Sequence, residues 1–283
     1  SQMSTLQELV VYNNSLTGTL TSLLGQLTEL QWLSISANLM TGTIPTELGQ
    51  LTNMHNLFLD TNLLNGTIPP ELGRLTSLLH LQLYNNTLSG ALSTQLATLT
   101  NLEILYVHSN KLTGTIPTEL GQLTSLLDLQ LYNNTLSGAL PTHLATLTNL
   151  EILYVDSNKL TGTIPTELGR LTSLLDLQLY NNSLTGTLPT ELGQLINLLW
   201  LAVEINKLTG PLPTELGQLT ALFGLNLFNN SLTGTLPTEI NQMVSLEYLD
   251  ISNNFFTGTV PLELIDNIGM NFTFDGNNFT DSN

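Results

Sequence analysis

Apolar residues recur along the chain in a pattern that repeats every 24 residues. In the repeat of residues 99–122, Leu102, Leu105 and Val107 lie eight, five and three positions before Asn110. The last two of these positions alternate with polar or variable ones, which is typical of a short strand with one buried face. The same Asn occurs eleven times at a spacing of 24 residues, from Asn14 to Asn254, without an insertion. The sequence therefore predicts a stack of coils that each contribute one short strand.

The residues that follow each Asn predict a turn and a short helix. Gly lies four positions after the Asn in eleven consecutive repeats, and Pro lies at the seventh position in nine of them. A segment such as Thr-Glu-Leu-Gly then suits one helical turn, with its Glu near the positive N-terminal end. The Asn side chain can bond backbone groups that are left unpaired where the strand turns away. Because one coil cannot bury its own leucines, neighbouring coils must stack.

The repeat L-x-x-L-x-L-x-x-N-x-L-x-G-x-I-P resembles the plant-type leucine-rich repeat of receptor-kinase ectodomains and cell-wall inhibitor proteins, which is also common in algae and protists. The resemblance covers nearly the whole chain. It implies an α/β repeat solenoid, a horseshoe of about 12 coils with a parallel concave sheet and short helical or 3-10 turns on the convex side. We predict a single solenoid domain over residues 1–283, with a shortened capping repeat over about 255–283. The cysteine-paired caps of the plant proteins are missing, since the chain has no Cys.

The resemblance places the positions six, four and two before each Asn on the concave surface. All seven Tyr and both Trp occupy these positions, together with several acids and no Lys or Arg. Exposed aromatic rings beside acids suit sugar rings or cationic side chains, so we predict a face that binds a protein, peptide or polysaccharide ligand. Stabilisation of the strands by stacked rings is the alternative. The predicted binding residues are Tyr84, Tyr106, Asp128, Gln130, Tyr132, Tyr154, Asp156, Asp176, Tyr180, Trp200 and Glu204.

Residues 84–131 and 132–179 are nearly identical. They differ at four positions, which are Ser93/Pro141, Gln95/His143, His108/Asp156 and Gln122/Arg170. The predicted face thus repeats its chemistry every two strands, or roughly 10 Å, which would suit a repeating ligand such as a polysaccharide. A recent tandem duplication explains the same identity equally well.

Charge and composition exclude several classes of function. The chain has 22 Asp and Glu against 5 Lys and Arg, a formal net charge of -17. This charge repels phosphate backbones and anionic lipid surfaces, so we expect no nucleic-acid partner. No apolar run reaches about 18 residues, so we expect no membrane insertion. The first residues lack the basic and apolar regions of a signal peptide, and we expect that any such peptide has been removed.

Eight Asn-x-Ser/Thr patterns are candidate glycosylation sites and favour an extracellular or cell-surface, secreted glycoprotein. The repeat itself readily generates such patterns, so they do not establish occupancy. The candidates are Asn13, Asn65, Asn85, Asn133, Asn181, Asn229, Asn271 and Asn278.

Catalytic signals are weak. His80 and His108 lie on the predicted face near Asp128, but an open sheet offers no cleft that excludes water, so we predict that the chain is not an enzyme. We expect no cofactor and no catalytic metal; a calcium ion shared by carboxylates on adjacent strands is the one alternative. The carboxylates concerned are Asp156, Asp176 and Glu204.

Thr-Gly-Thr recurs after the Asn in seven repeats, for example at Thr161–Thr163. Outward threonines about 7 Å apart within a coil and about 4.8 Å apart between coils would resemble the ranks of ice-binding solenoids. We therefore interpret the chain as a non-catalytic, receptor-like recognition or adhesion scaffold outside the cell. The alternatives are an ice-binding protein and a structural surface protein that self-associates through its coil ends.

Overall fold

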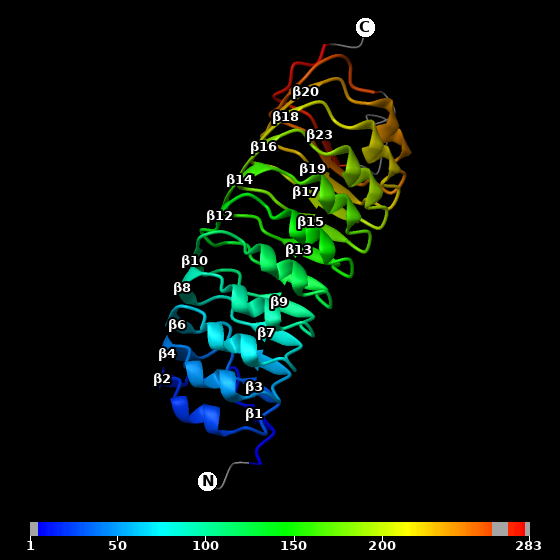
Figure 1. The fold of residues 1–283 in the computed structure, drawn as a ribbon. Coiled ribbons are helices and arrows are strands. Elements are labelled where there is room, and N and C mark those ends of the chain that lie inside the picture. The colour runs from blue at the N-terminus through cyan, green and yellow to red at the C-terminus, as the bar shows by residue number, and fades with distance from the viewer. Residues whose placement is uncertain (1–4, 262–270, 281–283) are drawn as a thin grey trace. The chain divides into compact units, whose positions relative to one another are not determined.

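The computed structural model describes residues 5–261 and 271–280, and the chain forms two compact units, Ser1–Ser137 and Gly138–Asn283. Both units are built from the same coil (Figure 1). Each coil contributes a main-sheet strand, a second strand after the conserved Asn, and a short 3-10 helix. The predicted coil length, parallel strands and 3-10 turns are confirmed in each unit. The single domain over residues 1–283 stays a prediction.

The main sheet of each unit has six parallel strands. In the first unit these are β1 (Glu8–Val10), β3 (Trp32–Ser34), β5 (Asn56–Phe58), β7 (His80–Gln82), β9 (Ile104–Tyr106) and β11 (Asp128–Gln130). In the second unit they are β13 (Ile152–Tyr154), β15 (Asp176–Gln178), β17 (Trp200–Ala202), β19 (Gly224–Asn226), β21 (Tyr248–Asp250) and β23 (Asn271–Thr273). Equivalent residues pair across neighbouring strands, as Leu81 does with Leu105, so each repeat position forms a column.

A second set of short strands follows the conserved Asn residues. In the first unit these are β2 (Thr17–Thr19), β4 (Leu39–Thr43), β6 (Leu63–Gly66), β8 (Thr87–Ala91) and β10 (Lys111–Thr113). In the second unit they are β14 (Lys159–Thr163), β16 (Ser183–Gly186), β18 (Lys207–Gly210), β20 (Ser231–Gly234) and β22 (Phe255–Phe256), while β12 (Ser137–Gly138) lies at the boundary. The pairing here is offset by two residues from the 24-residue period, since Thr19 pairs with Thr41.

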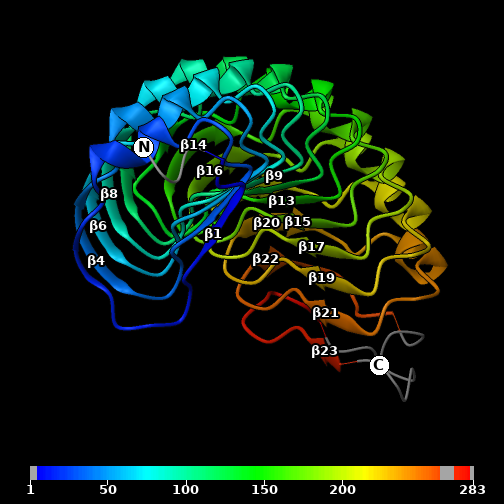
Figure 2. The ribbon, with the colours of Figure 1, turned by 90° about the horizontal axis from the view of Figure 1, so that it is seen from below.

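In the residues that the structure describes, ten 3-10 helices of five residues each are distributed over the two units. In each unit they lie on the side of the coils opposite the main sheet (Figure 2). They are η1 (Ser22–Gln26), η2 (Thr46–Gln50), η3 (Pro70–Arg74), η4 (Thr94–Thr98), η5 (Thr118–Gln122), η6 (Thr142–Thr146), η7 (Thr166–Arg170), η8 (Thr190–Gln194), η9 (Thr214–Gln218) and η10 (Thr238–Gln242). A Cβ added at Gly49 would lie 2.4 Å from the backbone oxygen of Glu71, so Gly permits the close stacking of these helices.

The conserved Asn side chains join neighbouring coils. The Nδ2 group of Asn86 donates to the carbonyls of Leu59, Leu83 and Tyr84 at 3.0, 3.1 and 3.2 Å. Its Oδ1 accepts from the Leu64 backbone N–H of the preceding coil at 2.9 Å. Backbone groups that the turn leaves unpaired are thereby satisfied, as the sequence predicted.

The last described coil keeps this arrangement although the repeat is one residue shorter. Asn277 bonds the carbonyls of Ile251 and Phe274 and accepts from the Phe256 N–H at 3.0 Å. The Phe256 and Phe279 rings are stacked with centroids 6.3 Å apart. The predicted cap over 255–283 also includes residues 262–270 and 281–283, which lie outside the described residues.

Candidate ligand-binding face

We call the exposed side of the main sheet the strand face. In the first unit, a stack of three rings runs across it. The imidazole of His108 lies between the rings of Tyr84 and Tyr132, with centroid distances of 4.5 and 4.1 Å and interplanar angles of 14° and 9°. His108 is 8% exposed. Burial disfavours its charged form and lowers the pKa of His108 to about 4, so the ring is neutral at physiological pH.

Beside the stack, a tyrosine, a carboxylate and an amide hold one another in place. The Tyr106 hydroxyl donates to Asp128 Oδ2 at 2.6 Å, and Gln130 Nε2 donates to both carboxylate oxygens at 3.2 Å. Burial, followed by the hydrogen bond to Asp128, raises the pKa of Tyr106, so its hydroxyl stays protonated.

The same trio recurs in the second unit. The Tyr154 hydroxyl donates to Asp176 Oδ2 at 2.7 Å, and Gln178 Nε2 lies 3.2 and 3.3 Å from the two carboxylate oxygens. Burial raises the pKa of the Asp176 carboxyl. The repeated sequence of residues 84–131 and 132–179 therefore preserves the local geometry as well as the residue types.

The stack itself is not duplicated, because Asp156 occupies the position of His108. Asp156 is 1% exposed and bonds the hydroxyls of Tyr180 and Ser157, while its Oδ2 has no hydrogen-bond partner. Burial raises the pKa of the Asp156 carboxyl. We predicted a surface hydrogen-bonding group here, but the structure places Asp156 beneath the strand face.

Glu204 lies in the same column of the second unit, and its Oε2 is buried without a hydrogen-bond partner. Burial raises the pKa of Glu204 to about 7, with a smaller contribution from Asp156. Residues 5–261 and 271–280 contain no group of three or more His, Asp or Glu arranged to hold a metal ion. The calcium alternative at Asp156, Asp176 and Glu204 stays a prediction.

Trp200 lies flat along the strand face because its neighbour is glycine. Its indole occupies the space of a Gly224 side chain, since a Cβ there would lie 2.1 Å from Trp200 Cζ3. The indole ring of Trp200 stacks on the ring of Tyr248, with centroids 5.5 Å apart. Its centroid lies 6.3 Å from that of the Phe223 ring. Phe223 directly precedes its strand, outside the positions from which we predicted binding residues.

The second unit has an open pocket at the start of β17, β19 and β21. Its volume is about 590 Å³, and it is lined by Leu199, Trp200, Ala221, Phe223, Ser245 and Glu247. Of these only Trp200 was predicted as a site residue. The sequence holds two signals near these strands. Phe223 departs from the repeat, and Ile196 and Val244 replace a Thr that eight other repeats share.

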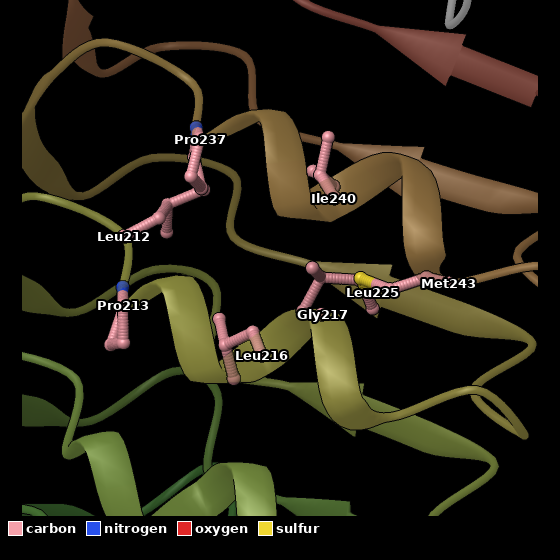
Figure 3. Close-up of a pocket in the computed structure, with 8 residues that line it drawn as sticks. All are labelled: Leu212, Pro213, Leu216, Gly217, Leu225, Pro237, Ile240 and Met243. Carbon is pink, nitrogen blue, oxygen red and sulfur yellow. The ribbon is translucent and has the colours of Figure 1, made fainter.

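A second, smaller pocket in the same unit has a volume of about 10 Å³ and lies under η9 and η10 (Figure 3). Its lining is mainly apolar side chains, which offer little to a polar ligand. We assign it no ligand. The lining residues are Leu212, Pro213, Leu216, Gly217, Leu225, Pro237, Ile240 and Met243.

The other site predictions concern different faces. All eight candidate glycosylation residues are exposed, and five of them have a positive φ of 51–54°, which Asn tolerates better than most residues. The threonines of the Thr-Gly-Thr segments are exposed as well. Their ranks are staggered rather than aligned, and hydroxyls such as that of Thr41 donate to a Gly carbonyl of the preceding coil, here at 3.0 Å.

No helix in the described part of the chain has the length and apolar character needed to cross a bilayer. All five basic residues lie away from the strand face, because Lys111, Lys159 and Lys207 begin strands of the second set and Arg74 and Arg170 end 3-10 helices. The strand face is therefore aromatic and acidic in both units.

Comparison with known proteins identifies the repeat. Family models described as leucine-rich repeat match residues 100–160, 173–195, 222–243 and 245–267. A search of curated protein sequences finds no match. A leucine-rich-repeat protein of Leptospira interrogans is 35% identical, with a TM-score of 0.74, over 96% of this chain and 73% of its own.

Two plant structures are also similar. The Arabidopsis receptor kinase HAESA, in complex with the peptide hormone IDA and the co-receptor SERK1, is 33% identical with a TM-score of 0.89, over 96% of this chain and 50% of its own. A plant ice-binding protein is 30% identical with a TM-score of 0.70, over 81% of this chain and 74% of its own. The chain spans about half the length of the plant receptor chains it matches.

These receptor ectodomains are ligand-binding rather than catalytic, and the chain shares their fold, which confirms the prediction that it is not an enzyme. The resemblance inferred from the repeat is confirmed too. The chain belongs to the leucine-rich-repeat family, and its repeats are of the plant type.

Proposed function

We propose that the chain is an extracellular recognition module that binds an extended, basic peptide across the strand face. The observation that carries the proposal is the chemistry of that face, which combines half-buried tyrosines, indole and carboxylates with no Lys or Arg. Such a surface attracts cationic side chains and offers them ring faces. The relatives support a peptide over a polysaccharide, because HAESA binds the peptide hormone IDA.

The trios of Tyr, Asp and Gln supply the polar part of the face. In each trio the carboxylate already accepts three hydrogen bonds, so it is fixed in position before a ligand arrives. A fixed carboxylate can accept further bonds from a cationic group without a large loss of side-chain entropy. The aromatic rings of the strand face in each unit would cover the apolar parts of the ligand.

The test is a titration of intrinsic fluorescence with basic peptides, acidic peptides and neutral or cationic polysaccharides. We expect saturable binding of basic peptides that weakens at high salt and falls at least tenfold in a Tyr132→Ala, Tyr154→Ala double variant. A Thr161→Ala, Thr163→Ala variant on the second set of strands is the control and should bind normally. Unchanged affinity in the tyrosine variant, or binding only to polysaccharides, would contradict the proposal.

Ice binding is a second candidate, which the exposed threonines and the similarity to a plant ice-binding protein favour. The staggered register and the hydroxyls bonded within the protein weaken it, since they leave fewer free donors in a regular array. Ice-recrystallisation assays on the same two variants separate the candidates. Loss of ice activity in the threonine variant alone would favour ice binding over peptide recognition.

We infer that the chain is a secreted or cell-surface glycoprotein, because its eight glycosylation candidates are all exposed. Expression through a secretory pathway followed by treatment with an N-glycosidase tests this. A mass shift that diminishes stepwise when Asn85, Asn133 and Asn181 are changed to Gln would support it. Secretion with no mass shift would contradict the glycoprotein assignment without affecting the peptide proposal.

A further inference from the structure

The pocket at the start of β17, β19 and β21 combines two aromatic rings with a carboxylate. Trp200 supplies an indole face, and Phe223 supplies a second ring whose plane is inclined by 32° to it. Glu247 also lines the pocket and is exposed. An open, largely apolar pocket with two aromatic rings and one carboxylate suits a planar cation on an apolar stem.

Local charge leaves Glu247 available for such a cation. The three basic residues of the second unit are Lys159, Arg170 and Lys207, and all belong to the second set of strands or to a 3-10 helix. An ion pair joins His80 to Glu103 in the first unit, and none in the described part of the chain involves Glu247. No cation of the second unit therefore neutralises Glu247.

Exposed apolar side chains precede two of the strands that border the pocket. Eight repeats have Thr four positions before the residue that opens the main-sheet strand, but Ile196 and Val244 replace it in the coils of Trp200 and Glu247. Ile196 is 56% exposed and Val244 is 81% exposed, while Phe223 is 45% exposed. Water-facing apolar side chains at a position that is otherwise Thr favour a surface that is covered by a ligand.

We propose that this pocket binds an arginine side chain, with the guanidinium stacked on Trp200 and paired with Glu247. The proposal rests on the function above, because it makes the pocket the anchor for one arginine of the basic peptide. Arginine fits better than lysine, since its planar group can stack on the indole and donate two hydrogen bonds to one carboxylate. Leu199 and Phe223 would cover the methylene stem.

The test uses N-acetyl-arginine amide as the probe, followed through the indole N–H signals of the two tryptophans by NMR. We expect a saturable shift of the Trp200 signal and none of the Trp32 signal. The citrulline analogue, which is isosteric and uncharged, should bind at least tenfold more weakly, and the lysine analogue should also bind more weakly.

Matched variants identify the groups responsible. Glu247→Gln should weaken arginine binding at least fivefold, whereas Glu151→Gln, at the same repeat position between Leu127 and Leu175, should not. Trp200→Leu should abolish binding, and Trp32→Leu should leave it intact. Because Trp200→Leu changes the packing on Gly224, Glu247→Gln at an exposed position is the decisive variant. Equal binding of citrulline, or full binding by Glu247→Gln, would overturn the proposal.

The outcome can be separated from that of the proposed function. The Tyr132→Ala, Tyr154→Ala variant should retain binding of N-acetyl-arginine amide, because neither residue lines the pocket. If basic peptides bind and respond to the tyrosine changes but not to Glu247→Gln, the peptide proposal stands and the pocket fails. If the arginine probe binds while no peptide does, the pocket stands and the peptide proposal fails.

Discussion

The imidazole of His108 is held between Tyr84 and Tyr132, with its Nε2 3.5 Å from the Tyr132 hydroxyl and its Nδ1 3.2 Å from Ser109 Oγ. The ring therefore has polar neighbours at both nitrogens while its faces are covered by tyrosines. Asp156 replaces it in the nearly identical segment that follows. One substitution thus separates a neutral aromatic stack from a buried carboxyl group.

The first prediction follows from the burial of His108. Its pKa falls from 6.5 when unfolded to about 4 in the folded chain, so the unfolded state takes up the proton first as the pH falls. This lowers the free energy of unfolding between about pH 6.5 and 4, by about 1–2 kcal/mol after allowance for solvent screening. Urea unfolding at pH 7 and pH 4.5 measures the loss, which should be smaller in His108→Gln. An equal loss in both proteins would contradict this account.

Glu204 makes the free energy of unfolding depend on pH in the opposite direction. Its pKa rises from 4.5 to about 7 on folding, so the stabilisation that it contributes below about pH 4.5 is lost as the pH rises to 7. Glu204→Gln should therefore raise the free energy of unfolding by about 1 kcal/mol at pH 8 and change it little at pH 4.5. Glu247→Gln, on an exposed position of the same unit, is the control. Destabilisation by Glu204→Gln at pH 8 would be the contrary result.

Ile205 has a φ of +54°, in the left-handed region that β-branched residues avoid. Asn occupies the equivalent position in several repeats, for example Asn229 with the same φ. Ile205→Asn should stabilise the chain by about 1 kcal/mol, because Asn tolerates this backbone conformation. Asn229→Ile should have the reverse effect. Thermal unfolding of both variants measures the pair, and similar changes of the same sign would argue against backbone strain as the cause.

The conserved Asn column should show its contribution most clearly at a buried position. Asn134 donates to the carbonyls of Val107, Leu131 and Tyr132 and accepts from the Leu112 N–H. Asn134→Leu should therefore cost about 3 kcal/mol or more in the free energy of unfolding, since four backbone groups lose their partner.

Asn14, which is exposed, provides the comparison. Its Nδ2 donates to two carbonyls, those of Val11 and Tyr12, so Asn14→Leu removes fewer bonds and water can replace them. Chemical unfolding of the two variants should show a clearly smaller loss for Asn14→Leu. Equal losses would mean that the side chains do not act through these hydrogen bonds.

The period of the sequence predicted the features that depend on position within a coil. It identified the strand positions, the Asn column and the helical turns, because burial at a fixed repeat position is the same in every coil. For the Tyr106 and Tyr154 trios, it predicted that the members of each trio lie on one face of the sheet. It did not predict their hydrogen bonds, since residue spacing does not fix side-chain conformation.

Other features depend on which neighbours meet across coils. His108 is buried because the rings of Tyr84 and Tyr132 cover its two faces, and Trp200 lies flat because Gly224 has no side chain. The two-residue offset in the pairing of Thr19 with Thr41 could not be predicted from the 24-residue period either. The period does not specify which residues of neighbouring coils pair with each other. Phe223 and Glu247 were missed because they precede the strands rather than belong to them.

The hydrogen bonds of the Asn column run in one direction along the chain, because each Asn bonds to the coil that precedes its own. An Asn caps the turn of the coil before it, as Asn38 does for Leu16, and its own coil is capped by the next Asn. If a whole number of coils is duplicated in place, each new coil has the same neighbours before and after it. The hydrogen bonds of the Asn side chains between coils can then all form again without further changes in sequence. The chain can thus lengthen by duplication at little structural cost, and the near identity of residues 84–131 and 132–179 is the pattern that such a duplication would produce.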